Sequence, residues 1–357
     1  MFSNGGGPVL RLRTFIIRRL LLLIPVLLGV SLFVFALTRI AGDPAAAYIT
    51  ERMGPQQIAI IKEQFHLNAP IPEQYYYWLD GVVHGNWGYS RVDGVPVTTA
   101  ISNHFPATFE LTLVSMVIAV VIGITMGTIS AVRRDTAVDH STRIVALAGV
   151  ALPIFVLGLI LQYIFSYQLG WLPINGDKDV QGLYLINAPS WFLANGTTSP
   201  TGYLLLDTIV HNDWTRFVDA FQHIILPAIT LSFSSIAIIT RIMRGSMLEV
   251  MNLDYVKTAR SKGLPERVVI KKHARRNALI PTTTVVGLSF GGLLGGAVLT
   301  ESIFSWPGLG RWSAQSTLTN DWASILGFTL LTAVIYVLAN LIVDIMYAYL
   351  DPRVRLE

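Results

Sequence analysis

Six stretches of this sequence are long and apolar enough to cross a lipid bilayer, and they constrain the fold more than any other feature. A membrane-spanning helix needs about 20 mostly apolar residues. The candidates are residues 20–38, 107–131, 144–170, 224–243, 278–300 and 323–350. Charged residues make up only 13% of the chain, whereas soluble domains carry about 25%. We therefore expect an all-α membrane protein with six transmembrane helices, and not a soluble enzyme.

The first stretch has an alternative interpretation as a secretory signal peptide, since it follows two basic residues, Arg18 and Arg19. Its apolar run is longer than the roughly 7–15 residues of a cleaved signal. We expect a helix that is retained in the membrane.

Positive charge alternates along the connecting segments. Most of the 26 Lys and Arg residues lie before the first span, after the second, after the fourth and after the sixth. Cytoplasmic loops of membrane proteins are enriched in Lys and Arg. The pattern therefore places both termini in the cytoplasm, which an even number of spans also requires. We expect a multi-pass protein of the cell membrane.

Spans and charges together divide the chain into six regions. These are the cytoplasmic N-terminus with the first span (1–39), an extracytoplasmic segment (40–106), the second and third spans (107–170), another extracytoplasmic segment (171–223), the last three spans with a cytoplasmic loop at 244–277 (224–350), and the cytoplasmic C-terminus (351–357). The aromatic run 75–78 suits either anchoring at the membrane interface or contact with a substrate. Asn195 begins a glycosylation sequon.

Ionisable residues are sparse in the spans. Glu110 lies near the outer end of the second span, and Asp344 lies in the sixth. A proton or ion pathway usually needs more such groups, so we expect Glu110 to be interfacial and Asp344 to pair within the bundle. Two G-x-x-x-G pairs, Gly123/Gly127 and Gly291/Gly295, predict close helix packing instead of a binding site.

Motifs for catalysis and cofactor binding are missing. The sequence has no G-x-x-x-x-G-K-[ST] phosphate loop, no H-E-x-x-H or other H-x-x-x-H metal spacing, and no Gly-x-Ser-x-Gly elbow. We therefore expect no catalytic residue, cofactor or metal site in this chain, and no nucleic-acid partner.

The segment between the fourth and fifth spans is the most basic loop of the chain. Asn252 or Asp254 can cap a short helix over 255–262, whose small apolar face holds Tyr255, Val256 and Ala259. Gly263 is suited to end that helix, and Pro265 to begin the next. A basic helix, a glycine turn and a helix that re-enters the membrane together predict a docking element for a cytoplasmic partner.

This loop resembles the EAA loop of binding-protein-dependent ABC importer permeases, whose pattern is E-A-A-x3-G followed by a helix. Residues 254–264 read DYVKTARSKGL, and residues 273–281 read HARRNALIP. Lys257, Thr258 and Ala259 occupy the E-A-A positions, so the acidic residue is absent. In addition, HARR at 273–276 replaces the I-x-L-P ending of the family pattern. Both departures are usual in the peptide-permease branch of the family.

Further motifs of that branch occur in order along the chain. They are GDP at 42–44, GNWGYS at 85–90, ESIFSWPGLG at 301–310 and DPRVR at 351–355. The sequence is therefore similar to the B-type permease subunit of dipeptide/oligopeptide ABC importers. The resemblance implies a type I ABC importer permease fold with extended extracytoplasmic segments.

The resemblance also implies a heteromeric importer of di- and oligopeptides. Its other parts would be a second homologous permease, two ATPase subunits that bind ATP and Mg²⁺, and an extracytoplasmic substrate-binding protein. Relatives that carry oligosaccharides or nickel keep those cargoes open. An ion-coupled secondary transporter and a purely structural membrane subunit are the alternatives outside the family.

Two groups of residues are candidates for function in such an importer, and substrate-contacting residues are not assigned. One group would couple to an ATPase, and the other would form an outer gate, contact the binding protein or cap the bundle. The coupling group is Asp254, Tyr255, Lys257, Thr258, Ala259, Gly263, Leu264 and Arg267, and the outer group is Glu301, Phe304, Trp306, Pro307 and Gly308.

Overall fold

Five apolar helices and one bent helix pair make up most of the protein. The computed structural model describes residues 8–41, 53–64, 66–174 and 203–350. Within these residues, the long helices are α1 (Pro8–Ala41), α4 (Val97–Val132), α10 (Trp214–Met251), α13 (Arg275–Gly296) and α16 (Trp322–Leu350). Each of these elements contains or belongs to a stretch that is long and apolar enough to cross a membrane.

The expected third span is not one continuous helix. It consists of α5 (Ala137–Ala151) and α6 (Ile154–Leu161), which continues as the π-helix η2 (Gln162–Gln168), and the two halves bend by 108°. The break falls at Leu152 and Pro153, whose ψ angles of 126° and 133° are extended. Proline lacks a backbone N–H and disfavours helical geometry at the residue before it, which accounts for the break.

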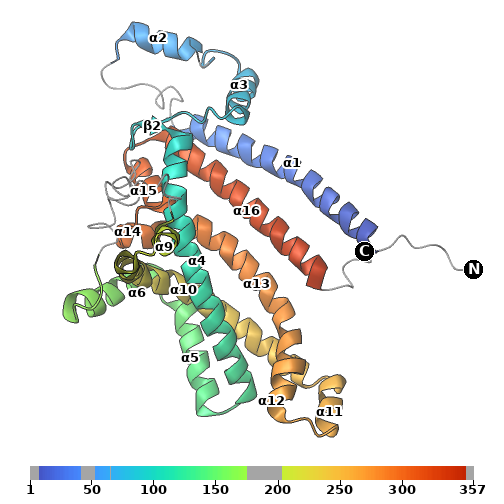
Figure 1. The fold of residues 1–357 in the computed structure, drawn as a ribbon. Coiled ribbons are helices and arrows are strands. Elements are labelled where there is room, and N and C mark those ends of the chain that lie inside the picture. The colour runs from blue at the N-terminus through green and yellow to red at the C-terminus, as the bar shows by residue number, and fades with distance from the viewer. Residues whose placement is uncertain (1–7, 42–52, 65, 175–202, 351–357) are drawn as a thin grey trace, which may run out of the picture.

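Helix α10 forms the centre of the bundle. It packs against α4, α5 and α13, while α16 packs on α13 and α1 packs on α16 (Figure 1). In the most apolar 18-residue stretch of α10, 72% of the stretch is buried inside the protein. The corresponding share for α16 is 11%. The outer faces of α1 and α16 therefore remain available for lipid or for another subunit.

Both predicted glycine pairs lie at helix–helix contacts. A Cβ atom on Gly127 would approach the Thr240 carbonyl oxygen of α10 to 2.7 Å, and one on Gly291 would approach the Ala339 Cβ of α16 to 2.8 Å. Gly123 and Gly295 have similarly close neighbours on α10 and α16. The packing interpretation is confirmed, because only glycine permits these backbone distances.

Short elements gather at the two ends of the bundle. One end carries α2 (Pro55–Gln64), α3 (Ile71–Val83) and an antiparallel hairpin of β1 (Tyr89–Ser90) and β2 (Val95–Pro96), with α14 (Val298–Ile303) and α15 (Leu309–Leu318) beside it (Figure 1). A further short helix, α9 (Leu204–Val210), precedes α10. The opposite end carries α11 (Asp254–Ser261), α12 (Glu266–Val268) and the π-helix η3 (Val269–Ala274).

The aromatic run of α3 divides between two environments. Tyr75 and Trp78 lie against Phe35 of α1, with ring centroids 5.3 and 5.7 Å away. The Tyr75 hydroxyl is 2.8 Å from the Ser31 hydroxyl of α1. Tyr76 remains exposed. Half of the run therefore fixes α3 to the first helix, and the other half is available at the surface.

Candidate functional site: an elbow and a cap

Residues 252–274 form what we call the elbow, which joins α10 to α13. Leu253 is the N-cap of α11 and provides no side-chain hydrogen bond. Asn252 instead donates from Nδ2 to the Leu248 carbonyl oxygen at 2.9 Å and closes α10. The expected capping by Asn252 or Asp254 is therefore wrong, because α10 continues to Met251 and uses Asn252 for its own end.

Gly263 ends α11, as the sequence predicted. Its φ of +75° lies in the left-handed region that favours glycine, and its N–H donates to the Arg260 carbonyl oxygen at 2.9 Å. Pro265 is the N-cap of α12 and not its first residue. The single helix expected after Pro265 consists of α12, η3 and α13 in succession. The local sequence does not predict the π-helical geometry of η3.

One face of α11 is anchored in the protein. Val256 and Ala259 are buried in a cluster with Met247 and Val250 of α10. The same cluster reaches Ala131 of α4, Val269 and Ala274 of η3 and Ala278 of α13. Since buried side chains in close contact move together, α11 is mechanically joined to the three long helices around it.

The other face of α11 is exposed. Leu253, Tyr255 and Leu264 present apolar surface, with 45%, 41% and 38% of each residue accessible. Lys257 forms an ion pair with Asp254 at 3.0 Å at the same surface. Thr258 and Arg267 are exposed too. All eight predicted coupling residues therefore lie on the elbow, and only Ala259 among them is buried.

An ion pair that the sequence did not predict bridges two parts of the elbow. Arg260 donates from Nε and Nη2 to the two carboxylate oxygens of Glu266, at 3.1 and 2.7 Å. This bidentate pair bridges the Gly263 turn, and the nearby carboxylate raises the pKa of the Arg260 guanidinium. The pairing becomes foreseeable only when the geometry of the Gly263 turn is known.

At the other end of the bundle, residues 87–108 and 298–324 form what we call the cap. After the fifth span the chain folds back: α14 is followed by a turn and then by α15. Phe304 and Trp306 in this turn are almost fully buried. Trp306 donates from Nε1 to the Ala107 carbonyl oxygen of α4 at 2.9 Å. These two side chains fix the turn to the bundle.

Glu301 is the buried acid of the cap. Its carboxylate accepts hydrogen bonds from the Thr108 hydroxyl at 2.7 Å and from the Arg311 backbone N–H at 3.0 Å. Burial raises the pKa of Glu301 to about 7. A Cβ on Gly308 would collide with this carboxylate, so glycine is required there. Of the five predicted outer residues, only Pro307 is partly exposed, and the other four are buried.

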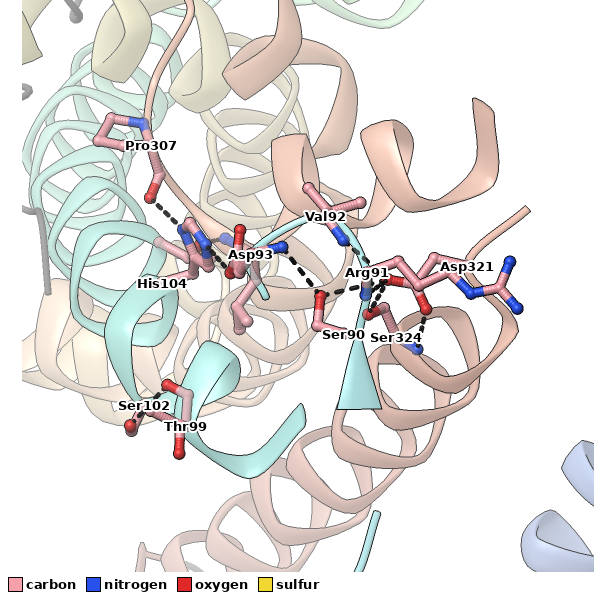
Figure 2. A network of polar contacts seen from close by, with 12 residues as sticks. Ser90, Arg91, Val92, Asp93, Thr99, Ser102, His104, Pro307, Asp321 and Ser324 are labelled. Carbon is pink, nitrogen blue, oxygen red and sulfur yellow. Dashed lines mark hydrogen bonds and ion pairs between the residues drawn. The ribbon is translucent and has the colours of Figure 1, made fainter. Parts of the chain in front are cut away.

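A second buried acid in the cap, Asp321, was not predicted. Its Oδ2 accepts from the backbone N–H of Arg91 at 2.7 Å and of Val92 at 3.2 Å, and from the hydroxyls of Ser324 at 2.7 Å and Ser90 at 3.2 Å (Figure 2). Asp321 thereby fixes the hairpin turn to the start of α16.

His104 of α4 links the hairpin to the turn before α15. Its Nδ1 donates to the Pro307 carbonyl oxygen at 3.0 Å, and its Nε2 lies 2.8 Å from the Asp93 carboxylate (Figure 2). The hairpin, α4 and the α14–α15 turn therefore meet around one side chain. Nothing in the local sequence distinguishes His104 from the other histidines.

The structure supplies partners for Glu110, which the sequence predicts near the outer membrane interface. Glu110 is buried, and its carboxylate accepts from the backbone N–H groups of Leu204 at 3.1 Å and Leu205 at 2.6 Å. It therefore holds the first turn of α9, whose unpaired N–H groups need acceptors. The acidic residue in an apolar span was the signal, but its partner lies 94 residues further on.

Some predicted features lie outside the described residues. These are the motifs at 42–44 and 351–355, the Asn195 sequon and the side chain of Asp344. Within the described part of the chain, no group of three or more His, Cys, Asp or Glu side chains is arranged to hold a metal ion.

Comparison with known proteins identifies the family. Residues 119–356 match the model of the binding-protein-dependent transport system inner membrane component, and residues 12–112 match the model of its N-terminal region. The chain belongs to this family. It is therefore a permease with the type I ABC importer fold, and not a catalytic enzyme or an ion-coupled secondary transporter.

Individual permeases resemble this chain over nearly their whole length. A dipeptide transport system permease of Alkalihalophilus pseudofirmus is 41% identical over 95% of this chain and 98% of its own. A di/tripeptide permease of Pseudomonas aeruginosa is 43% identical, and a dipeptide permease of Escherichia coli is 39% identical, each over 96% of this chain and 98% of its own. As a permease of a binding-protein-dependent importer, the chain works with an ATPase and a substrate-binding protein.

Proposed function

We propose that this permease forms half of the translocation path of an ATP-driven importer of di- and oligopeptides. The observation that carries the cargo class is the full-length similarity to permeases named for dipeptide and tripeptide transport. The distribution of charge fits such a path. The carboxylate of Glu110, in the second span, accepts hydrogen bonds from two backbone N–H groups. It therefore does not present a free charge to a passing peptide.

The elbow is the surface that couples this subunit to an ATPase. Its exposed apolar side chains, Leu253, Tyr255 and Leu264, offer a small docking face, while Val256 and Ala259 hold α11 to the bundle. Closure of the ATPases on ATP would displace α11, and α10 and α13 would tilt with it because they share the same buried cluster. A nucleotide needs to favour one conformation by a few kcal/mol to drive such a two-state cycle.

The complete importer contains a second homologous permease and two ATPase subunits that carry ATP and Mg²⁺. Both termini and the elbow face the cytoplasm, as the distribution of Lys and Arg supports. The cap then faces outward, where an extracytoplasmic binding protein delivers the peptide. Pro307 and the exposed parts of the hairpin are available to it. Glu301, Phe304 and Trp306 are buried, so they support the outer surface of the cap and do not contact the binding protein themselves.

The test is ATP hydrolysis by the purified complex in lipid, with its binding protein and candidate peptides. We expect peptide-loaded binding protein to stimulate hydrolysis and to drive peptide uptake into vesicles. Stimulation by oligosaccharides or nickel alone would retain the importer and overturn the peptide cargo. Failure of any ATPase to co-purify from gently solubilised membranes would overturn the proposed role of the elbow.

A further inference from the structure

A buried ion pair joins α5 to α10 near the elbow. Asp139 lies in the first turn of α5 and is fully buried. Arg244 of α10 donates to it from Nε and Nη2, each at 2.8 Å, one to each carboxylate oxygen. The planar fork of arginine matches a carboxylate in this way, whereas lysine offers a single point of charge.

Additional donors complete the site. The Ser130 hydroxyl of α4 donates to Asp139 Oδ1, and the Asp135 backbone N–H donates to Oδ2 at 3.1 Å. Arg244 Nε is also 3.1 Å from the Ser130 oxygen. The carboxylate therefore binds groups from the end of α4, the α4–α5 turn and α10 at once. Apolar side chains could fill the same space, but they would not fix one relative position of the three segments.

The location of this pair relates it to the elbow. Arg244 lies about two helical turns before α10 ends and α11 begins. On the same side of α10, Gly127 of α4 approaches the Arg244 backbone so closely that a Cβ there would be 3.1 Å from its nitrogen. The end of α4 also contributes Ala131 to the cluster that holds α11. Helix α5 contributes no residue to that cluster. The ion pair between Asp139 and Arg244 instead connects the start of α5 to this end of α10.

We infer that Asp139 and Arg244 are positioning residues that make the α4–α5 hairpin move with the elbow. Displacement of α11 then shifts four helical segments as one body: α4, α5, α10 and α13. Without the pair, α10 can tilt while the start of α5 lags behind it. The inference rests on the proposed coupling function, since it concerns how motion of the elbow reaches the rest of the bundle.

A distance measurement tests this inference directly. The chain contains no cysteine, so the substitutions H140C on α5 and E249C on α10 give it two label sites, and both parent residues are exposed. The partner subunits are used in cysteine-free form. Pulsed electron paramagnetic resonance on the whole complex would compare the nucleotide-free and vanadate-trapped states. We expect the label distance to stay the same in both states. In Asp139→Asn, the distance should change or broaden on trapping. A wild-type distance that changes with nucleotide as much as the variant's would overturn the inference.

Transport provides the second readout. Asp139→Asn should reduce uptake per ATP hydrolysed by roughly tenfold, with normal amounts of assembled complex in the membrane. Arg244→Lys, which keeps the charge but loses the fork, should fall between this variant and the wild type. The matched control is Arg143→Gln, which removes an exposed charge one turn further along α5 and leaves the groups around Asp139 in place. An equal loss in the control would overturn the assignment to Asp139.

The two readouts separate this inference from the proposed function. The distance comparison needs only nucleotide and the ATPases, so it stands even if peptides prove to be the wrong cargo. If Asp139→Asn fails to assemble, the same label distance is measured in Arg244→Lys. A distance that changes or broadens on trapping supports the positioning role, and a distance that stays constant rejects it. Unchanged uptake per ATP in both variants would reject the positioning role, whatever the cargo.

Discussion

The elbow and the cap use polar side chains in opposite ways. The elbow pairs its charges at the surface, as in Lys257–Asp254 and Arg260–Glu266, and buries only small apolar residues. The cap buries its acids, Glu301 and Asp321, and surrounds them with backbone and hydroxyl donors. Surface pairs contribute little free energy and can rearrange, whereas a buried acid with several donors fixes one geometry. The elbow is therefore suited to docking, and the cap to holding a shape.

The largest effect should follow from breaking the turn of the elbow. Gly263→Pro replaces a φ of +75° by about −65° and removes the N–H that bonds to Arg260. We expect peptide uptake to fall by at least about tenfold while ATP hydrolysis continues without stimulation. The measurement is uptake and hydrolysis by the same reconstituted complex. Gly263→Asn is the control, because asparagine tolerates a left-handed φ. Wild-type coupling in the proline variant would contradict the role of this turn.

The next largest effect concerns the stability of the cap. Asp321→Ala leaves the hydroxyls of Ser90 and Ser324 and two backbone N–H groups without their acceptor. We expect the unfolding free energy to fall on the order of 3 kcal/mol, measured by thermal unfolding in detergent. Asp254→Ala on the elbow removes a highly exposed carboxylate and should leave the melting temperature unchanged. Equal losses in both variants would erase the contrast between cap and elbow.

The buried acid Glu301 should make the cap sensitive to pH. Its folded-state pKa is about 7, above its ordinary value of 4.5, so the folded state binds more protons between these values. Stability should therefore fall as pH rises from about 4.5 to above 7, and that decline should be weaker in Glu301→Gln. Melting temperatures of both proteins across this range provide the measurement. Identical pH profiles would show that Glu301 does not titrate in the folded cap.

The smallest effect on stability should come from the ion pair of the elbow. Arg260 and Glu266 are both partly exposed, and such pairs contribute about 0–1 kcal/mol. We therefore expect Arg260→Gln to leave the melting temperature nearly unchanged but to lower the coupling of hydrolysis to uptake. A large drop in melting temperature would mean that the elbow is as rigidly built as the cap.

Local features of the sequence determined the outline of this protein. The apolar runs located the long helices, because a bilayer demands about 20 apolar residues in succession. Gly263 marked the end of α11, since glycine adopts its left-handed φ without strain, and the glycine pairs marked close helix contacts. The family motifs located the elbow and the outer group of residues at 301–310. Pro153 was visible in the third span, but whether such a proline bends or breaks a helix depends on its neighbours.

Only the tertiary structure decided which polar groups meet. Asp139 and Arg244 are 105 residues apart, Ser90 and Asp321 are 231 apart, and Glu110 holds a helix 94 residues away. Periodicity assigns a side chain to a face of its own helix, but its partner depends on how separate helices pack. An acid in an apolar span therefore signals that a partner exists, and the packing of the bundle determines which one it is.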